Sequence, residues 1–553
     1  MTATARRAMF FVPSVHPVAP TGSFLSRCSG RETSTAKRTF VARRPVRSGT
    51  CALGNLRANS SVDTGANKGD ATRERSADQP YKVLIANRGE IAVRAIRTCQ
   101  ELGIRTVQIY STADADSLAV RLADERICIG PPLARESYLN IPTIISACEV
   151  TGADAVYPGF GFLSENARFA DLLERHGITF IGPSARAISL MGDKSTAKTT
   201  MRRAGVPTVP GSEGLLRDLN DARQVAEQIS YPVMLKATAG GGGRGIRLVR
   251  SVAELENAFI TCQQEAKSAF GNDALYMEKF IESPRHVEIQ IIGDSHGNVI
   301  YLGERDCSVQ RRNQKLLEEA PSPAVTPETR KKMGEAACRA AQAIGYCGAG
   351  TVEYIMASNG DFYFMEMNTR IQVEHPVTEM ITGLDIVALQ IAVARGEPLP
   401  IHQEQVQLNG WAMEARINCE DVLQAFRPMP GLITNFLAPG GNGVRWDGCI
   451  YPGYNVPAFY DSMLGKLICW GPTRDAAIRK LRRALREMQI DGVPTTVPFH
   501  LALLEHPVFQ EGKTIYTNFI ERERIMEQLK ERAKAANETT ERPKAATLEK
   551  AAA

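Results

Sequence analysis

The most distinctive stretch of the sequence is Lys236-Ala-Thr-Ala-Gly240-Gly241-Gly242-Gly243-Arg244-Gly245. It stands between two strand-like apolar runs, residues 232–235 and 246–249. Four consecutive glycines leave backbone N–H groups unobstructed, which suits a mobile lid over phosphate groups. A Walker loop is excluded, because in that motif the lysine follows the glycines and a helix comes next. A flexible linker is the alternative, and the charges of Lys236 and Arg244 make it less favourable.

A second group of candidate residues lies on two expected strands joined by an Asn-Gly turn. Glu353 belongs to one strand, and Glu366 and Asn368 belong to the other. Side chains alternate between the two faces of a strand, so an antiparallel pair places these three on one face. Three hard oxygen ligands with room for phosphate oxygens suit magnesium. Solvated surface carboxylates are the alternative, but the flanking apolar residues argue against an exposed strand.

A dense polar run, residues 368–375, follows directly from the second of these strands. Arg370 offers a planar fork for a carboxylate or bicarbonate, and Glu374 can act as a base if its environment tunes it. We interpret His375 as a structural histidine rather than a catalyst. Two further cations supply fixed positive charge, although each alone is more typical of a surface ion pair: Lys315 and Arg416.

Residues 81–195 alternate short apolar runs with helical periodicity, which predicts a parallel sheet with helices on its faces. The turn Asn87-Arg-Gly-Glu90 has one glycine where a dinucleotide-binding fingerprint has three, which argues against nicotinamide binding. A tight strand-to-helix turn with no further role is the alternative for this local pattern.

The rest of the chain predicts an α/β and α+β multidomain protein. Residues 196–400 show longer strands and hairpin signals typical of an antiparallel sheet, with a lid over about 208–282. Residues 401–520 read as a last α/β segment with a basic helix near 473–488. Residues 521–553 are expected to form a solvated helix or frayed tail.

The composition indicates a globular protein rather than a disordered or fibrous one, with 553 residues, 43% of them hydrophobic and 23% charged. The formal net charge of +5 arises in residues 1–80, which hold 13 Lys and Arg against 5 Asp and Glu. The remainder is slightly acidic, so no nucleic-acid surface is expected. No run approaches the roughly 18 apolar residues of a membrane span. The twelve cysteines are scattered and predict reduced thiols.

The first 80 residues are rich in hydroxyl-bearing and basic side chains and poor in acids. They lack a continuous apolar core, which indicates an organellar transit peptide rather than a secretory signal. We expect a chloroplast address, with the mitochondrion as an alternative, and a disordered cytosolic arm as a third interpretation.

Taken together, these features resemble the biotin carboxylase family of the ATP-grasp superfamily. The resemblance covers residues 81–520 and rests on strings that stand in family order: Ile85-Ala-Asn-Arg-Gly-Glu-Ile91, Gly159-Phe-Gly-Phe-Leu-Ser-Glu-Asn166, Met191-Gly-Asp-Lys194, the tetraglycine loop, Glu304-Arg-Asp-Cys-Ser308, Glu366-Met-Asn-Thr-Arg-Ile-Gln-Val-Glu-His-Pro-Val-Thr-Glu379 and Tyr460-Asp-Ser-Met-Leu-Gly-Lys466. It implies an ATP-dependent carbon–nitrogen ligase that carboxylates biotin with bicarbonate.

The resemblance also implies roles for matching positions. The residues expected around ATP are Lys194, Lys236, Gly242, Gly243, Glu278, Lys279, Ile281, His286, Asn313, Glu353 and Glu366. The expected ligands of magnesium, or of manganese in its place, are Glu353, Glu366 and Asn368. The expected bicarbonate and biotin pocket comprises Lys315, Arg370, Gln372, Val373, Glu374 and Arg416. Of these, the catalytic residues would be Arg370, Glu374, Lys315 and Arg416.

The implied mechanism begins with proton transfer from bicarbonate to Glu374. Bicarbonate then attacks the γ-phosphate to give carboxyphosphate, which yields carbon dioxide and phosphate. Phosphate takes the ureido proton of biotin, Arg416 stabilises the enolate, and the biotin nitrogen attacks carbon dioxide.

Three positions depart from the family pattern. Asn313 stands where some members have histidine, and Phe160 replaces a frequent tyrosine near the bicarbonate region. Asn442 occupies a position where bacterial members place an aromatic at the dimer contact. A homodimer is still expected, with candidate contact residues Arg97, Glu101 and Arg445.

The partners implied are a biotin carboxyl carrier protein and carboxyltransferase subunits, since no Met-Lys-Met biotinylation tripeptide is present. With the leader, this favours the heteromeric acetyl-CoA carboxylase of plastids, which supports malonyl-CoA and fatty acid synthesis. Two alternatives remain: the biotin carboxylase subunit of a mitochondrial acyl-CoA carboxylase, and a noncatalytic assembly subunit that has kept the fold.

Overall fold

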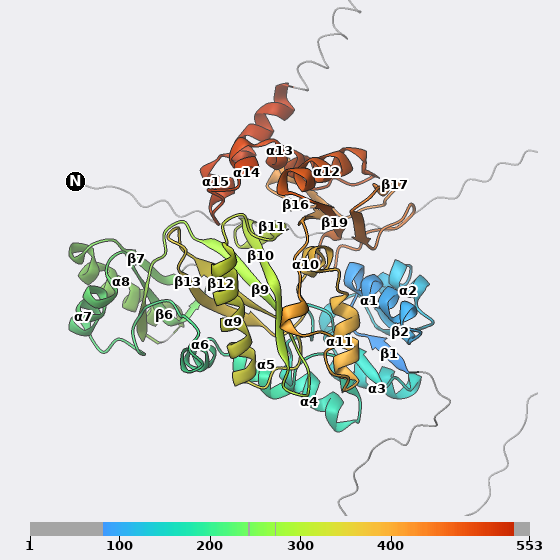
Figure 1. Cartoon of the computed structure of the whole chain (residues 1–553), viewed down its shortest axis with the longest axis horizontal. Helices are drawn as coiled ribbons and strands as arrows, with labels where there is room; N and C mark the ends of the chain where they lie inside the picture. Colours follow the sequence, from blue (N-terminus) through green and yellow to red (C-terminus); the bar gives the residue numbers. More distant parts are fainter. Residues whose placement is uncertain (1–80, 242–243, 271, 536–553) are drawn as a thin grey trace, which may run out of the picture. The chain divides into compact units, whose positions relative to one another are not determined.

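The computed structural model describes residues 81–241, 244–270 and 272–535 (Figure 1). The predicted leader, Gly242, Gly243 and residues 536–553 lie outside this part of the chain.

The N-terminal region is a parallel sheet with helices, as the alternating pattern predicted. Five strands pair in the order β3-β2-β1-β4-β5, all parallel. Val83, Leu84 and Ile85 in the central strand are fully buried, which is typical of a parallel strand covered on both faces. The elements are β1 (Lys82–Ile85), α1 (Gly89–Glu101), β2 (Arg105–Ser111), α2 (Leu118–Leu122), β3 (Glu125–Gly130), α3 (Ile141–Thr151), β4 (Ala155–Tyr157), α4 (Ala167–Arg175), β5 (Thr179–Phe180) and α5 (Ala185–Gly192).

The lid is a small antiparallel sheet with its own core. Strands β6 (Val233–Gly241), β7 (Arg244–Val249) and β8 (Leu275–Lys279) pair in the order β7-β6-β8. Helices α7 (Leu219–Ile229) and α8 (Val252–Phe270) contact these strands, and α6 (Lys194–Arg203) precedes them in the chain. The glycine run therefore joins two strands, as predicted.

The largest element is an eight-stranded sheet in the order β13-β12-β9-β10-β11-β14-β19-β18, antiparallel throughout. Helix α9 packs against β9 and β10 through a core that includes Met333, Ala337 and Ile289 (Figure 1). The elements are β9 (Arg285–Gly293), β10 (Val299–Arg311), β11 (Gln314–Ala320), α9 (Pro327–Ala343), β12 (Gly348–Met356), β13 (Phe362–Asn368), α10 (His375–Thr382), α11 (Ile386–Ala394), β14 (Trp411–Asn418), β18 (Val444–Gly448) and β19 (Met463–Gly471).

The two predicted hairpin turns join strands of this sheet. Residues 295–298 lie between β9 and β10, and residues 358–361 lie between β12 and β13. The sheet also crosses the boundary expected at residue 400, because β14 pairs with β11. Three strands of the last α/β segment, β14, β18 and β19, extend the same sheet.

The remaining C-terminal elements pack around a second large core. Helix α12 (Arg474–Glu487) is N-capped by Thr473 and covers β19 and β14. Residues 525–535 of the tail form a helix, which is one of the two predicted forms, and only Ile525 and Leu529 of this helix are buried. The other elements are β15 (Glu420–Asp421), β16 (Arg427–Pro428), β17 (Asn435–Leu437), β20 (Gln489–Asp491), α13 (Val497–Glu505), α14 (Pro507–Glu511), α15 (Phe519–Arg522) and the short 3-10 turns η1 (Thr112–Asp114), η2 (Ala134–Glu136), η3 (Gln403–Gln405) and η4 (Val422–Gln424).

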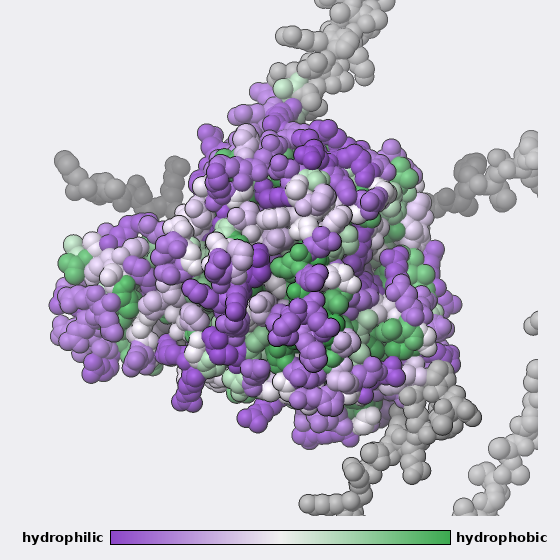
Figure 2. Space-filling view, viewed as in Figure 1, coloured by the Kyte–Doolittle hydropathy of each residue, from purple (hydrophilic) through white to green (hydrophobic). Residues whose placement is uncertain are grey.

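Hydrophilic residues dominate the face of the molecule seen in Figure 2, with apolar residues in smaller patches. In the part of the chain that the structure describes, no single helix is long and apolar enough to cross a membrane. The bent pair α10 and α11 passes that test together, with an angle of 97° between its helices. Ile386, Val387 and Ile391 of this pair belong to the buried core.

Candidate active site

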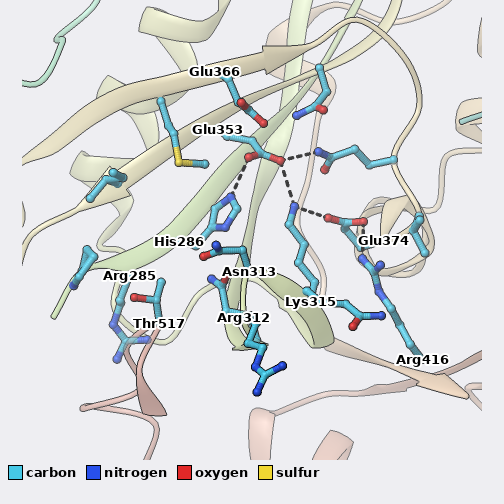
Figure 3. A pocket seen from close by; sticks show the side chains of 18 of the residues that line it. Arg285, His286, Arg312, Asn313, Lys315, Glu353, Glu366, Glu374, Arg416 and Thr517 are labelled. Carbon is cyan, nitrogen blue, oxygen red and sulfur yellow. Dashed lines mark hydrogen bonds and ion pairs between the residues drawn. The ribbon is translucent and has the colours of Figure 1, made fainter. Parts of the chain in front are cut away.

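A cavity of about 840 Å³ lies over the middle of the large sheet (Figure 3). Its walls come from β9, the β10–β11 hairpin, β12, β13, the loop before α10 and β14. Twelve of the residues expected to form the site line it: Lys194, His286, Asn313, Lys315, Glu353, Glu366, Asn368, Arg370, Gln372, Val373, Glu374 and Arg416.

Lys315 on β11 is the centre of the charge network in this cavity. Its Nζ lies 2.6 Å from Glu288, 3.0 Å from Glu353 and 2.6 Å from Glu374. Burial alone would lower the pKa of this ammonium group, but the surrounding acidic groups raise it well above its ordinary value. Lys315 is therefore a fixed positive charge rather than a titrating group.

Glu374, the predicted base, lies between two cations. One carboxylate oxygen accepts a hydrogen bond from Lys315 at 2.6 Å, and the other accepts one from Arg416 at 2.9 Å (Figure 3). Burial opposes ionisation, but Lys315, Arg416 and Arg305 together hold the pKa of Glu374 well below its usual range. The side chain is thus a buried carboxylate that faces a cationic pocket.

Arg416 on β14 uses both edges of its guanidinium group. Its Nη2 donates to Glu374, and its Nε donates to Glu318 at 2.7 Å. Glu318 is fully buried, and this burial raises its pKa to about 7 although Arg416 opposes the shift. Arg416 was predicted from the sequence, whereas Glu318 was not, because the two residues meet only through the pairing of β11 with β14.

Arg370 lines the cavity, and three of its five N–H donors contact groups within the protein. Nε lies 2.9 Å from Glu165, Nη2 donates to the Asn368 side chain at 2.9 Å, and Nη1 donates to the Ile371 carbonyl at 3.1 Å. The fork expected to hold a carboxylate or bicarbonate thus already has a carboxylate partner. Glu165 belongs to the family-like string 159–166, which was the one signal for it in the sequence.

The predicted metal ligands lie together at the edge of the sheet. Glu353 and Glu366 stand directly opposite each other on β12 and β13, and Asn368 follows on β13. Glu353 is buried, accepts hydrogen bonds from Lys315 and from Gln372 at 2.7 Å, and lies 3.0 Å from His286. Burial opposes its ionisation, but Lys315 and His286 hold its pKa well below the usual value. The Glu366 carboxylate lies 3.8 Å from Lys194.

The described residues among the remaining nucleotide candidates, Lys236, Glu278, Lys279 and Ile281, lie in the predicted lid region and do not line the cavity. Lys236 lies 2.5 Å from Glu278, and Lys198 of α6, which the sequence analysis missed, pairs with the other oxygen of that carboxylate. Lys279 donates to the backbone carbonyls of residues 230 and 231, and Ile281 is half-buried. Gly242 and Gly243 lie outside the described residues.

Arg305 does not line the cavity but contacts residues around it. It is fully buried and contacts Glu288 at 2.5 Å, Gln372 at 3.2 Å and Thr351 at 3.1 Å. It thereby holds one partner of Lys315 and one residue of the polar loop. Arg305 belongs to the family-like motif 304–308, but the motif alone did not predict the contact of Arg305 with Glu288.

His375 agrees with its interpretation as a structural residue. Its side chain is fully buried, and Nδ1 lies 2.8 Å from the carbonyl oxygen of Gln372. Burial and the nearby cations Lys466 and Arg94 lower its pKa well below the usual value. The His375 ring is therefore neutral and holds the loop before α10 through its hydrogen bond to Gln372.

The three residues that depart from the family pattern lie at different distances from the cavity. Asn313 lies in the β10–β11 turn with φ of 65° and lines the cavity. Phe160 does not line it, and its carbonyl accepts a hydrogen bond from Asn87. Asn442, Arg97 and Glu101 are exposed. The fourth residue of the expected dimer set, Arg445, contacts Glu379 and Asp447 within the chain.

Comparison with known proteins assigns the family. The model described as "Biotin carboxylase, N-terminal domain" matches residues 79–188, "Carbamoyl-phosphate synthase L chain, ATP binding domain" matches 193–402, and "Biotin carboxylase C-terminal domain" matches 414–522. The "Biotin carboxylase" of Nostoc sp. is 58% identical over 440 residues, which cover 80% of this chain and 98% of that protein. The "Biotin carboxylase, chloroplastic" of Arabidopsis thaliana is 56% identical over 439 residues, 79% of this chain and 82% of that protein.

A solved structure agrees with these relatives. The biotin carboxylase domain dimer of 2-oxoglutarate carboxylase from Hydrogenobacter thermophilus, described with MgADP, ADP and bicarbonate, aligns with a TM-score of 0.72 and 50% identity. The alignment covers 80% of this chain and 98% of that one. The fold is that of an ATP-grasp ligase.

The chain belongs to the biotin carboxylase family. The resemblance inferred from the sequence is thereby confirmed, together with the mixed α/β fold class and the ATP-dependent ligase activity.

Proposed function

We propose that this chain carboxylates biotin on a separate carrier protein, as the first half-reaction of an acetyl-CoA carboxylase that supplies malonyl-CoA for fatty acid synthesis. The observation that carries the proposal is the placement of Glu374 between Lys315 and Arg416 in one cavity with the Glu353–Glu366 pair. A base, two fixed cations and two hard oxygen ligands are the groups that bicarbonate activation by ATP requires.

Glu374 would accept the proton of bicarbonate. A general base works best when its pKa lies near the working pH, whereas Lys315 and Arg416 hold the pKa of Glu374 low. A bicarbonate anion that enters between these cations shares their charge with Glu374. That sharing weakens their hold on the carboxylate and raises its pKa toward the range of a useful base.

The deprotonated bicarbonate oxygen would then attack the γ-phosphorus of ATP. A new P–O bond forms, the bond to the β–γ bridging oxygen breaks, and ADP leaves, so the product is carboxyphosphate. Lys315 is close enough to Glu353 and Glu374 to balance the negative charge that gathers between the two substrates.

Magnesium would lie at Glu353, Glu366 and Asn368. Two opposed carboxylates and one amide oxygen form a hard oxygen donor set, which fits magnesium and also manganese. When bound, the metal would neutralise charge on the phosphate oxygens of ATP. His286 and Gln372, which contact the Glu353 carboxylate, would keep it oriented toward the cavity.

Arg416 would serve the second part of the reaction. Carboxyphosphate yields carbon dioxide and phosphate, and phosphate takes the N–H proton of the biotin urea. Arg416 stabilises the resulting enolate, whose nitrogen attacks carbon dioxide. Its contact with Glu318 fixes the guanidinium plane for this purpose.

The nucleotide would bind between the cavity and the lid. Lys236 and Glu278, with Lys279, Ile281, Gly242 and Gly243, would contact ATP from the lid side, and Lys194 and Asn313 would contact it from the cavity side. The paired lysines at Glu278 supply positive charge for the phosphates.

The partners follow from the same proposal. We expect a biotin carboxyl carrier protein and carboxyltransferase subunits, and a homodimer like the one described for the Hydrogenobacter thermophilus domain. Purification of the complex from the organelle and identification of its biotinylated chain tests the first two. Biotin on this chain itself would refute a separate carrier.

We place the protein in the chloroplast stroma, with the mitochondrial matrix as the alternative. The support is the hydroxyl-rich basic leader together with the similarity to a relative described as chloroplastic. Residues 1–80 fused to a fluorescent protein should enter chloroplasts. Import into mitochondria instead would favour the acyl-CoA carboxylase of that organelle.

Activity of the purified protein tests the reaction itself. We expect bicarbonate-dependent ATP cleavage that free biotin stimulates, and Glu374→Gln should remove the stimulation while the protein stays folded. Glu149→Gln, a surface carboxylate beside His176, is the matched control and should leave turnover unchanged. Well-folded protein without any stimulation by biotin would favour the noncatalytic assembly subunit.

A further inference from the structure

Lys466 is a fully buried lysine on β19 that the reaction described above does not use. Its Nζ donates a hydrogen bond to the Val373 carbonyl at 2.7 Å and lies 3.1 Å from Glu90. We propose that Lys466 is a positioning residue: it holds the backbone before Glu374, with Glu90 as its counterion, and thereby sets the geometry of the bicarbonate site. This inference rests on the proposed role of Glu374 as the base.

The peptide bond carries the effect of this contact to Glu374. Because the peptide unit is planar, fixing the Val373 carbonyl also fixes the N–H and Cα of Glu374. The neighbouring carbonyls are held as well, by the His375 ring at Gln372 and by the N–H of Val377 at Glu374. Three successive carbonyls of the loop thus have donors, and at Val373 the donor is a charged side chain.

Lys466 and Arg416 both contact the dipeptide Val373-Glu374, Lys466 at its backbone and Arg416 at its side chain. They are direct cross-strand partners in β19 and β14, so their side chains project from the same face of the sheet. Arg416 holds the Glu374 carboxylate at 2.9 Å, and Lys466 holds the carbonyl one residue earlier at 2.7 Å. Helix α10, which begins at His375, contacts both strands. This pair of cations therefore fixes both the side chain and the backbone of the proposed base.

Glu90 explains why the ammonium group can be buried at this place. Glu90 lies in the first turn of α1, directly after the Asn87–Gly89 turn that had no assigned role. Burial raises its pKa to about 7, and Lys466 opposes this shift. Asp447 is the cross-strand partner of Lys466 on its other side. These acidic groups compensate the desolvation of the lysine.

The contact also joins three separate parts of the sequence. Glu90 comes from the parallel sheet region, Val373 from the loop before α10, and Lys466 from the C-terminal segment. A second link runs beside it, because Arg88 contacts Asp114 at 2.9 Å and Asp461 at 3.4 Å. The strings 85–91 and 460–466 thus meet beneath the polar loop rather than serving two unrelated turns.

Lys82 is a matched control within the same chain. Its Nζ donates to the Thr151 carbonyl at 2.6 Å and pairs with Glu125 at 2.9 Å, so it makes the same two kinds of contact. It lies in β1 and does not line the cavity. Loss of this lysine removes a comparable structural contact without touching the loop.

The experiment compares Lys466→Met, the double variant Lys466→Met with Glu90→Gln, and Lys82→Met in the full chain. Melting temperature, kcat, and the KM values for ATP and bicarbonate are measured for each. The single variant leaves Glu90 buried without its cation and is expected to lose stability. The double variant removes both charges and is expected to melt close to the unaltered protein, but its Val373 carbonyl still lacks the donor.

We expect both Lys466 variants to lose about 30- to 100-fold in kcat, the order of effect of a small misplacement of a reacting group. Their KM for bicarbonate should rise severalfold while the KM for ATP stays within about twofold. Lys82→Met should keep all three values. The proposal is overturned if the double variant regains normal kcat and bicarbonate KM together with its stability, because Lys466 would then be a structural group.

If the unaltered protein shows no biotin-stimulated ATP cleavage, the proposed function itself fails. If the unaltered protein is active and the double variant is equally active, the proposed function stands and the positioning role of Lys466 is refuted.

Discussion

Replacing Lys315 by methionine perturbs the site most directly, because one ammonium group contacts three carboxylates. Its Nζ lies within 3.0 Å of Glu288, Glu353 and Glu374. Methionine keeps the chain length and removes the charge. Leaving buried carboxylates without their cation typically costs about 3 to 5 kcal/mol. In a folded region of this size, that loss should lower the melting temperature by roughly 3 to 5 °C.

The destabilisation should grow with pH. Burial would raise the pKa of Glu353 and Glu374, but their cations, Lys315 first, hold both below the ordinary value. A lowered folded-state pKa contributes stability above the unfolded pKa of about 4.3 and loses it as the pH falls through the folded value. Without Lys315, burial dominates and at least one folded-state pKa rises above the unfolded value. That carboxylate then destabilises the variant increasingly as the pH rises.

Thermal melts at pH 6 and pH 8 measure this difference, and biotin-stimulated ATP cleavage measures the loss of turnover, which we expect to be about 100-fold or more. Lys331→Met is the control, because its ion pair with Glu335 is exposed and should contribute less than about 1 kcal/mol. A Lys315→Met protein that melts within about 2 °C of the unaltered one at pH 8 would refute the reasoning, since the buried carboxylates would then be stable without the cation that they share.

Two further residues give independent predictions. Glu366→Gln removes one anionic ligand from the proposed metal site, so turnover should require more magnesium while the melting temperature is kept; equal turnover at limiting magnesium would contradict the assignment. Lys198 has a pKa lowered to about 8, first by burial and then by Lys236 and Lys194, so its charge is lost as the pH rises above 8. If it helps to bind phosphates, the KM for ATP should rise over that range, and Lys198→Arg, which stays charged, should flatten the profile. A profile unaffected by the arginine variant would exclude Lys198 from the nucleotide site.

The parts of the site that the sequence could predict are those with local patterns. Glu353 and Glu366 were placed on one face from the alternation of two strands and one Asn-Gly turn, and they stand opposite each other in β12 and β13. The strands on both sides of the glycine run follow from the same kind of local signal. In each case the residues that decide the structure lie within about one hairpin of each other.

The parts that escaped prediction depend on contacts between distant segments. Glu318 meets Arg416 because β11 pairs with β14, across a separation of 98 residues, and Glu165 meets Arg370 across 205. No periodicity or turn signal reports such a pairing. The same limit explains why the boundary expected near residue 400 gave no sign that strands on its two sides belong to one sheet.

That continuous sheet has a consequence for how the chain could be divided. Cutting near residue 400 would strip β14 from β11 and leave a row of unsatisfied N–H and C=O groups along a long, buried strand. An uncovered edge of this kind pairs readily with other chains. A fragment ending there should therefore aggregate and should not fold as an independent nucleotide-binding domain. The final 150 or so residues are thus part of the same folding unit as the strands before them.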